Sequence, residues 1–275
     1  MKITIVGLGL IGGSIAKALA LSKKHEIYAI DTDEQVLLDA MSAGVIKNKA
    51  TFRDLGDSEV VYLCMYPEGI VDFVNMHRND FGKDTIVTDV CGIKNHIYGK
   101  LREISLESGF TYIGAHPMAG KEVNSFASSD ASLYYGASYI VIKDEGHSEQ
   151  IAKLTLLAGE MGFGRIVFAT PEEHDTMIAY TSQLPHVLAC AYVMSPQCAK
   201  HKGFSAGSYR DVSRVAKINE ELWTDLFLSN RKALIDEIDI LSENIGKIRT
   251  AVEAEDRESL TELLAAARHA KEIYG

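Results

Sequence analysis

His116 has the side chain and the sequence surroundings of a proton acceptor. It lies in the segment AHPMAG, where the proline that follows it biases its backbone toward an extended conformation. A neutral imidazole, with an ordinary pKa of about 6.5, can accept a proton at neutral pH. The small residues after Met118 leave room for a ligand to approach. We therefore treat His116 as a candidate catalytic residue, although a single histidine in a loop is usually just solvated.

A second set of polar residues follows later in the chain. Ser182 and His186 are one helical turn apart and so share a face, and Pro185 between them is expected to kink the helix. Arg210 and Arg214 are also spaced to share a face. A planar guanidinium can bind a carboxylate through two N–H groups, so these arginines either hold an acidic ligand or form surface salt bridges. The spacing alone favours neither interpretation.

The N-terminal segment contains a dinucleotide-binding fingerprint. β-Branched residues predict strands at 2–6 and 26–30, and an alanine- and leucine-rich segment predicts a helix at 14–21 between them. Glycines allow a tight turn and the close approach of a pyrophosphate, which the unpaired N–H groups at the start of the helix can bind. The residues expected to bind the cofactor here are Gly7, Gly9, Leu10, Ile11 and Gly12.

Asp31 ends the second of these strands, where a carboxylate can accept a hydrogen bond from a ribose 2′-hydroxyl. Its charge would repel a 2′-phosphate, and the three residues after it supply no arginine to bind one. We therefore expect NAD rather than NADP. The alternative is a purely structural turn, and the complete order of strand, glycines, helix, strand and acid argues against it.

The loop at 88–94 also follows a predicted strand and combines polar with small residues. Ligands of open α/β sheets bind beyond the carboxyl ends of the strands. The loop at 88–94 and the residues around His116 both follow the ends of predicted strands. We therefore include Asp89 among the residues expected to bind the cofactor. The four cysteines form no zinc-binding pattern with histidines, so no metal is expected.

Composition limits the classes of function. The chain has 275 residues, of which 47% are hydrophobic and 24% charged, as in soluble globular proteins. A net charge of −10 argues against nucleic acid or an anionic membrane as the main partner. Four cysteines without CxxC spacing favour reduced thiols in the cytoplasm. The N-terminus imitates a signal peptide, but glycines interrupt it and cleavage would remove the glycine loop. No apolar segment is long enough to span a bilayer.

Strand and helix patterns alternate up to about residue 168, which predicts a doubly wound α/β sheet of the Rossmann type. The segments 138–142 and 165–168 are expected to be its last strands. After Thr170 and Pro171 only helices are predicted, including one that runs from about 172 to 201. We therefore predict a dinucleotide-binding domain at 1–169 and an all-helical domain at 170–275.

The predicted helix from residue 234 has an apolar stripe with alternating spacings of four and three. The stripe consists of Leu234, Ile238, Leu241, Ile245, Ile248 and Val252. It can be covered by the terminal helix, predicted from about residue 257, or by a second copy of the chain. Both arrangements bury the same face, so the pattern does not separate them.

Four motifs together resemble the prephenate dehydrogenase family, which includes arogenate-using members. They are GLGLIGGS at 7–14, HPMAG at 116–120, SQLPH at 182–186 and RDVSRVA at 210–216. They occur in the order of the family and cover nearly the whole chain. Only the glycine loop is common to many other families, whereas the other three are specific in combination.

The resemblance implies the NAD-dependent oxidative decarboxylation of prephenate to 4-hydroxyphenylpyruvate in tyrosine biosynthesis. A hydride leaves ring carbon C4, the 4-hydroxyl loses its proton, and the ring carboxylate leaves as CO2. His116 matches the family's proton acceptor and His186 its second active-site histidine. Arg214 matches the substrate-binding arginine, with Arg210 and Ser182 as expected helpers. The helical domain of the family forms a homodimer and closes over the active site.

One loop departs from the family pattern. Members often have Gly-Ser-Val-Lys where this chain has CGIK at 91–94, so Gly92 replaces a serine that can bind the 4-hydroxyl. A water or the Cys91 thiol is a candidate replacement, and the choice between prephenate and arogenate stays open. A 3-hydroxyacid or imine reductase is a further alternative, but its Lys-x-x-x-Asn motif is not found. An NAD-responsive regulator would need a binding module that we do not identify.

Overall fold

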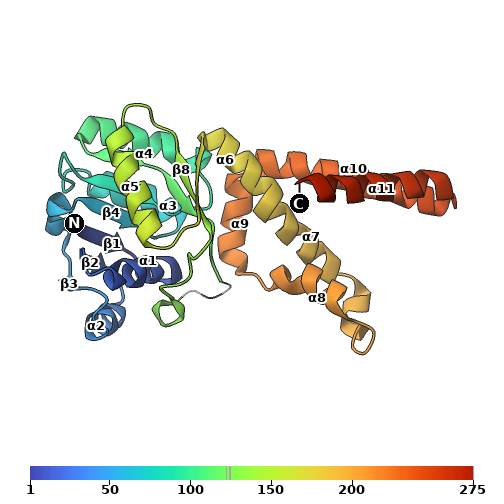
Figure 1. Cartoon of the computed structure of the whole chain (residues 1–275), viewed down its shortest axis with the longest axis horizontal. Coiled ribbons are helices and arrows are strands. Elements are labelled where there is room, and N and C mark those ends of the chain that lie inside the picture. Colours follow the sequence, from blue (N-terminus) through green and yellow to red (C-terminus); the bar gives the residue numbers. More distant parts are fainter. Residues whose placement is uncertain (122, 124, 275) are drawn as a thin grey trace.

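The computed structural model describes residues 1–121, 123 and 125–274. An α/β part is followed by a helical part, which ends in a hairpin of two helices that projects away from the sheet (Figure 1). The boundary predicted between residues 169 and 170 remains our proposal for the division into domains.

The α/β part is built on a six-stranded parallel sheet, as the alternating pattern predicts. Its strand order is β3-β2-β1-β4-β5-β6. From β1 the chain first adds β2 and β3 on one side and then β4, β5 and β6 on the other. Dinucleotides bind beside the point where this direction changes. The strands are β1 (Lys2–Val6), β2 (Glu26–Ile30), β3 (Asn48–Lys49), β4 (Val60–Leu63), β5 (Ile86–Asp89) and β6 (Thr111–Ile113).

Helices cover both faces of this sheet, so its central strands are buried on both sides. One apolar cluster joins the sheet to residues of α1, α2 and α5, and the other joins it to α3 and α4. The helices are α1 (Leu10–Leu21), α2 (Glu34–Ser42), α3 (Pro67–Met76), α4 (Asn95–Ser108) and α5 (Ser148–Glu160).

A second sheet of three strands corrects the expectation of one continuous sheet. It consists of β7 (Ala115–Pro117), β8 (Ser138–Ile142) and β9 (Arg165–Ala169), with β7 antiparallel and β9 parallel to β8. The chain leaves the large sheet at Gly114, whose carbonyl accepts from the amide of Ile142 at 2.9 Å. The sequence predicted β8 and β9 but not β7, and the alternation of strands and helices carries no information about which strands pair.

The helical part begins where the sequence provides a start signal. Thr170 and Glu173 cap α6 (Pro171–Ile178) reciprocally through side chain and backbone, with Pro171 in the first turn. A π-helical turn (Ala179–Gln183) connects α6 to α7 (Leu184–Val193). It lies just before Pro185, which lacks the N–H that a regular α-helix would need there.

The predicted continuation of this helix to residue 201 is wrong, because α7 ends at Val193. Ser195 precedes a proline and takes an extended conformation, with ψ of 138°, and only a 3-10 turn (Pro196–Lys200) follows. The remaining helices are α8 (Gly207–Ser213), a 3-10 turn (Arg214–Ala216), α9 (Glu220–Ser229), α10 (Arg231–Glu253) and α11 (Arg257–Tyr274).

The apolar stripe of α10 is only partly covered by its own chain. Leu234 is buried, whereas Ile245, Ile248 and Val252 are 51%, 40% and 57% exposed. The hairpin that α10 forms with α11 therefore leaves a row of aliphatic side chains in solvent. In the part of the chain that the structure describes, no helix is long and apolar enough to cross a membrane.

Candidate active site

The glycine loop has the geometry of a phosphate cradle. Gly7 has φ of +93°, and a Cβ at Gly12 would lie 1.9 Å from the carbonyl oxygen of Gly7, so both positions require glycine. A Cβ at Gly9 would meet no protein atom within 4 Å. Gly9 precedes α1, which has neither a side-chain cap nor an acidic residue in its first turn. The N–H groups of Leu10 and Ile11 at this helix start are thus suited to bind an anion.

Asp31 is fixed at the edge of this loop. One of its carboxylate oxygens accepts from the amide of Leu8 at 2.6 Å, and the other accepts from the amide of Asp33 at 2.9 Å. The side chain is half-buried, and each oxygen keeps a further lone pair for a hydroxyl. The residues therefore fit a bound dinucleotide with its ribose at Asp31.

Asp89 corrects the expectation of a direct contact with the cofactor, because its side chain is completely buried. One oxygen accepts from the ammonium of Lys94 at 2.6 Å and from the amide of Cys91 at 2.8 Å, and the other accepts from the hydroxyl of Tyr112 at 2.6 Å. Lys94 is equally buried and also donates to the carbonyl of Cys91. This ion pair instead holds the loop between β5 and α4 in shape.

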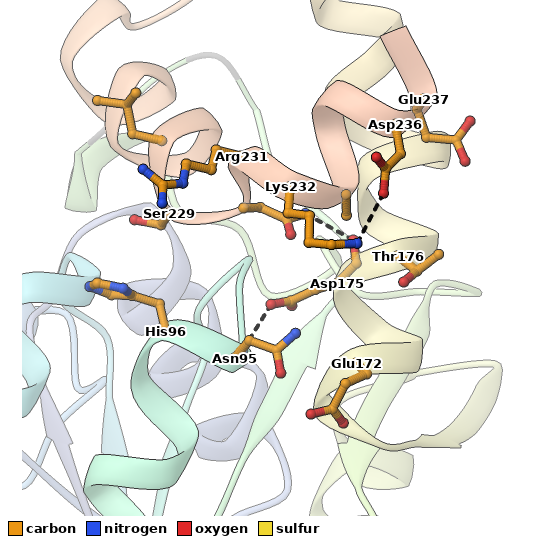
Figure 2. A pocket seen from close by; sticks show the side chains of 13 residues that line it. Asn95, His96, Glu172, Asp175, Thr176, Ser229, Arg231, Lys232, Asp236 and Glu237 are labelled. Carbon is orange, nitrogen blue, oxygen red and sulfur yellow. Dashed lines mark hydrogen bonds and ion pairs between the residues drawn. The ribbon is translucent and has the colours of Figure 1, made fainter. Parts of the chain in front are cut away.

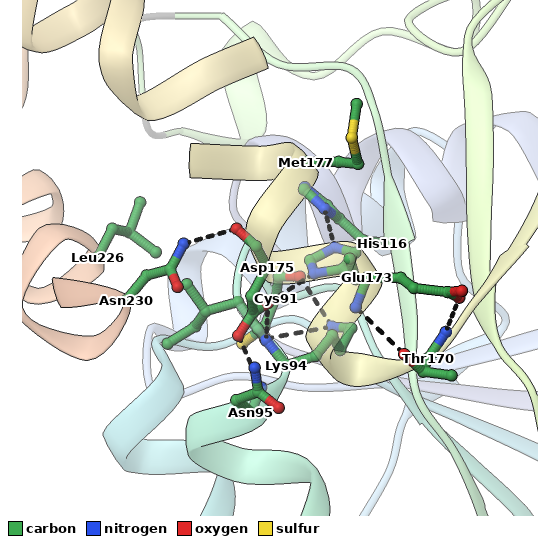
Figure 3. Close-up of polar contacts among 12 residues, drawn as sticks. Cys91, Lys94, Asn95, His116, Thr170, Glu173, Asp175, Met177, Leu226 and Asn230 are labelled. Atoms are coloured by element: carbon green, nitrogen blue, oxygen red, sulfur yellow. Dashed lines mark hydrogen bonds and ion pairs between the residues drawn. The ribbon is translucent and has the colours of Figure 1, made fainter. Parts of the chain in front are cut away.

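His116 lies in β7, and its ring is held by a second histidine. Its Nδ1 is 2.9 Å from Nε2 of His174, and Nδ1 of His174 is 2.7 Å from the carboxylate of Asp175. Figure 3 shows His116 and Asp175 in this region. The position of Gly92 lies on the Nε2 side of the His116 ring, and no described residue hydrogen-bonds to that nitrogen.

The expectation of an ordinary pKa for His116 is corrected by its surroundings. Burial is the main cause that holds the pKa of His116 well below its ordinary value of 6.5, with His174 and the Lys94 ammonium adding to it. Burial also lowers the pKa of His174, although the hydrogen bond to Asp175 opposes this. Both imidazoles are therefore neutral at pH 7, and His116 can accept a proton there.

Asp175 connects the helical part to the α/β part. Its carboxylate accepts from the amides of Lys94 and Asn95, both at 2.8 Å, at the start of α4. Its backbone carbonyl accepts from the side chain of Asn230, which also donates to Gln183. Figure 3 shows Lys94 and Asn95 on one side of Asp175 and Asn230 on the other. Asp175 thus joins the start of α4 through its carboxylate and Asn230, at the start of α10, through its backbone carbonyl, and Asn230 extends this network to Gln183 in the π-helical turn.

Gly92 leaves a small space that Leu226 faces. A Cβ at this position would lie 3.7 Å from Leu226 Cδ2 and 3.8 Å from Nε2 of His116, both ordinary van der Waals distances. Cys91 packs into the apolar cluster under the sheet, and burial raises the pKa of its thiol. The Cys91 thiol therefore does not take the place of the family's serine, and the side chain nearest to that place is apolar.

His186 and Gly92 both lie beside α9. Its Nδ1 donates to the carbonyl of Ser182 at 2.8 Å, and its ring stacks on Trp223, with ring centroids 3.6 Å apart. Trp223 and Leu226 are one turn apart on α9 and so face the same way. The helix α9 therefore brings His186 and the Gly92 loop to one region, which the sequence motifs alone could not show.

The two arginines are on the surface of the helical part. Arg210 is in α8, where its side chain is 79% exposed and 3.8 Å from the carboxylate of Asp211. Arg214 is also exposed and begins the 3-10 turn that packs against α7, the helix of His186. Arg214 thus lies next to α7 and its substrate-binding role stays a prediction, whereas nothing in the contacts of Arg210 distinguishes it from a surface residue.

A hollow of about 740 Å³ lies at the junction of the two parts, but His116 does not line it (Figure 2). Asn95 and Asp175 lie on one side, and Arg231 and Lys232 at the start of α10 lie on the other. Lys232 pairs with Asp236 at 3.3 Å across one turn of α10. The hollow is open and of mixed charge, so we assign it no ligand. Among the described residues, no group of His, Cys, Asp and Glu could hold a metal ion.

Comparisons with known proteins agree with this arrangement. Residues 15–167 match the model of the prephenate dehydrogenase nucleotide-binding domain, and residues 170–266 match that of the prephenate dehydrogenase dimerization domain. The chain belongs to the prephenate dehydrogenase family. It is therefore a dehydrogenase with a nucleotide-binding domain and a dimerization domain, which decides against the reductase and regulator alternatives.

Individual relatives extend over most of the chain. It is 32% identical to the prephenate dehydrogenase of Bacillus subtilis, over 94% of this chain and 73% of the relative. It is 30% identical to the cyclohexadienyl dehydrogenase of Zymomonas mobilis, over 94% of this chain and 91% of the relative. The crystal structure of Synechocystis arogenate dehydrogenase superposes with a TM-score of 0.86 at 25% identity and covers 100% of both chains.

The sequence places Asp175 about three helical turns before His186, on the same face, but it assigned no role to His174, Asp175 or Trp223. His174 and Asp175 lie fewer than ten residues before the SQLPH motif. A histidine next to a carboxylate in a predicted helix was a usable signal of a functional site. Trp223, the only tryptophan of the chain, gave none, because its contact with His186 depends on how α9 packs.

Proposed function

We propose that this family member oxidises and decarboxylates prephenate to 4-hydroxyphenylpyruvate with NAD+. The observation that carries the proposal is the orientation of His116. Its Nδ1 is held by His174, and its Nε2 is left for a ligand beside Gly92. A neutral imidazole held in this way is suited to accept the proton of a hydroxyl that becomes a carbonyl.

The chain's own groups divide the work of the reaction. Nε2 of His116 accepts the 4-hydroxyl proton as ring carbon C4 is oxidised, and the proton returns to the phenol oxygen as CO2 leaves. Arg214, with His186, is proposed to hold a carboxylate of the substrate, which carries two negative charges. A bound nicotinamide supplies the hydride acceptor. Positioned acid–base catalysis of this kind typically contributes about 10²–10⁴ in rate.

The cofactor preference is proposed from Asp31. Its carboxylate is fixed by the amides of Leu8 and Asp33, so it cannot turn away from a ligand at the end of β2. A ribose 2′-hydroxyl can donate to it, whereas a 2′-phosphate would meet its charge. We therefore propose that NAD+ is preferred over NADP+.

The assembly proposed is a homodimer formed through the helical part, in the cytoplasm. The exposed aliphatic row on α10 supports this, because three of its members lie 40% or more in solvent in a single chain. Sedimentation equilibrium should give about 60 kDa, twice the 30.2 kDa of one chain. A species of 30.2 kDa at micromolar concentration would contradict the proposal.

The experiment that tests the function is a product assay of the purified chain. Prephenate and arogenate are each supplied with NAD+ or NADP+, and the aromatic product is identified by mass. We expect 4-hydroxyphenylpyruvate from prephenate with NAD+ as the fastest reaction. If arogenate is converted to tyrosine at a higher kcat/KM, the preferred substrate is arogenate and not prephenate. If neither compound gives a product, the proposal is overturned.

A further inference from the structure

The direction of the hydrogen bonds between His116, His174 and Asp175 is fixed by Asp175. Its carboxylate accepts from Lys94 N and Asn95 N, so it acts as an acceptor toward Nδ1 of His174 as well. His174 therefore has its proton on Nδ1, and its Nε2 is a lone pair. Nδ1 of His116, 2.9 Å away, must then donate to it. This leaves Nε2 of His116 without a proton and facing the space at Gly92.

We propose that His174, with Asp175 as its counter-ion, takes over the proton that His116 accepts from the substrate. This inference rests on the proposed function and adds a positioning pair to it. Neither residue contacts the substrate position, and both come from α6 of the helical part. They act through Nδ1 of His116, whose orientation and proton they determine.

The transfer balances in protons and charge. The O–H bond of the substrate hydroxyl breaks, and an N–H bond forms at Nε2 of His116. The Nδ1–H bond of His116 breaks, and an N–H bond forms at Nε2 of His174. The positive charge then lies on His174, 2.7 Å from the Asp175 carboxylate, instead of on His116. The same steps in reverse return the proton to the phenol oxygen, so the relay needs no other reactant.

The charged groups around His174 support this location of the charge. Asp175 adjoins it on α6, and Asp89 of β5 also favours its protonated form. Lys94, at the start of α4, disfavours the charge on both histidines. Only His174 has a hydrogen-bonded carboxylate to offset burial, so the proton is better placed there than on His116.

The first test reads the tautomers of the wild-type chain without cofactor or substrate. Long-range ¹⁵N–¹H NMR of the imidazole rings at pH 7.5 should show both His116 and His174 protonated on Nδ1 only. Assignment comes from His116→Asn and His174→Gln. A proton on Nε2 of His116 in the wild-type chain would overturn the relay, whatever the activity of the protein.

The second test is the pH dependence of kcat for His174→Gln. The glutamine carbonyl can still accept from Nδ1 of His116, but it cannot carry a proton. We expect kcat to fall about 10- to 100-fold with little change in KM for the substrate. We also expect the acidic limb of the kcat–pH profile, which is the fall of kcat at low pH, to move to lower pH. In the wild-type chain the first proton goes to the pair, and without His174 it must go to the buried His116 itself.

This direction separates the relay from a structural defect. A site opened to water by the substitution would let the pKa of His116 rise toward 6.5, and the limb would move to higher pH. A limb that does not move, or moves up, contradicts the proposal. His25→Gln is the matched control, because His25 is also buried and is 2.6 Å from a carboxylate, that of Glu160. It should leave kcat and the limb unchanged.

The two levels of the account fail in different ways. A wild-type chain inactive on both prephenate and arogenate overturns the proposed function. An active wild-type chain with the wrong tautomer, or with an unshifted limb in His174→Gln, overturns the relay alone.

Discussion

The glycine loop and the His116 site are both at the carboxyl ends of strands, yet they are built in opposite ways. The loop is local, since its glycines, the start of α1 and Asp31 lie within residues 7–31. The His116 site takes its side chains from β7, α6 and α9 and depends on the first residues of α4 and α10. A local motif is defined by spacing in the sequence, whereas a site assembled from distant segments is defined by packing.

This difference determines how each region should respond to mutation. In the loop, each residue has its own function, so single substitutions should affect the cofactor and leave the substrate alone. In the assembled site, one residue, Asp175, contacts several segments at once through its carboxylate and its backbone carbonyl. Substitutions there should affect orientation and proton transfer together.

Among the effects on ligand binding, the largest is expected for Gly12→Ala in the loop. Its Cβ would lie 1.9 Å from the carbonyl oxygen of Gly7, so the loop must move. We expect a loss of about 3 kcal/mol in unfolding free energy and a more than ~100-fold rise in Kd for NAD+. Gly9→Ala is the matched variant, because its Cβ meets no protein atom. It should keep the Tm and raise Kd about 10-fold. Equal Tm losses in both would show that Gly9 is structural and not a cofactor contact.

The next effect is expected for Arg214→Ala. Loss of a cation that holds a substrate carboxylate should raise KM roughly 30-fold, or about 2 kcal/mol, the lower end of the range because Arg214 is exposed. The Kd for NAD+ should not change, and Arg214→Lys should restore only part of the affinity because lysine lacks the planar fork. Arg78→Ala, another exposed arginine, serves as control. A KM equal to that of the control would assign Arg214 to the surface.

A smaller effect is expected for Asp31→Ala. It removes the acceptor for the 2′-hydroxyl and the charge that repels a 2′-phosphate, so the preference for NAD+ over NADP+ should shrink about 10-fold. The ratio of kcat/KM for the two cofactors measures this directly. Asp57→Ala, which removes an exposed aspartate whose carboxylate is 3.6 Å from the Lys2 ammonium, should leave the ratio as it is. A wild-type chain that uses both cofactors equally would refute the role given to Asp31.

The smallest effect is expected for Gly92→Ser. A Cβ fits at ordinary contact distances from Leu226 and His116, so the chain should fold normally and keep kcat within about threefold. The larger Gly92→Leu should overlap the Nε2 side of His116 and lower kcat strongly. If the serine variant raises kcat well above wild type, then the apolar environment at this position limits the natural enzyme.

The predicted strands 2–6, 26–30, 138–142 and 165–168 agree with the structure to within one residue, because runs of β-branched and apolar residues are local signals. The sequence did not predict β3 or β7, and it placed the start of α1 four residues too late. It did not predict that β8 and β9 pair in a separate sheet with β7, since pairing depends on where the chain bends at Gly114. It found His116 and His186 through motifs. The sequence also predicted that Asp89 binds the cofactor. A carboxylate at the end of a strand has the same sequence pattern whether its side chain faces a ligand or a buried lysine.

The proposed reaction depends on neutral His116, which accepts the proton of the substrate hydroxyl. The most direct measurement is kcat as a function of pH, for the wild-type chain and for His116→Asn, with prephenate and saturating NAD+. The lowered pKa of His116 keeps the imidazole neutral down to pH values below 6.5, so wild-type kcat should be flat at neutral pH and fall only below 6.5. His116→Asn should lower kcat about 10²–10⁴-fold and abolish this acidic limb, with the Kd for NAD+ unchanged. A variant that retains both the rate and the limb would contradict the account.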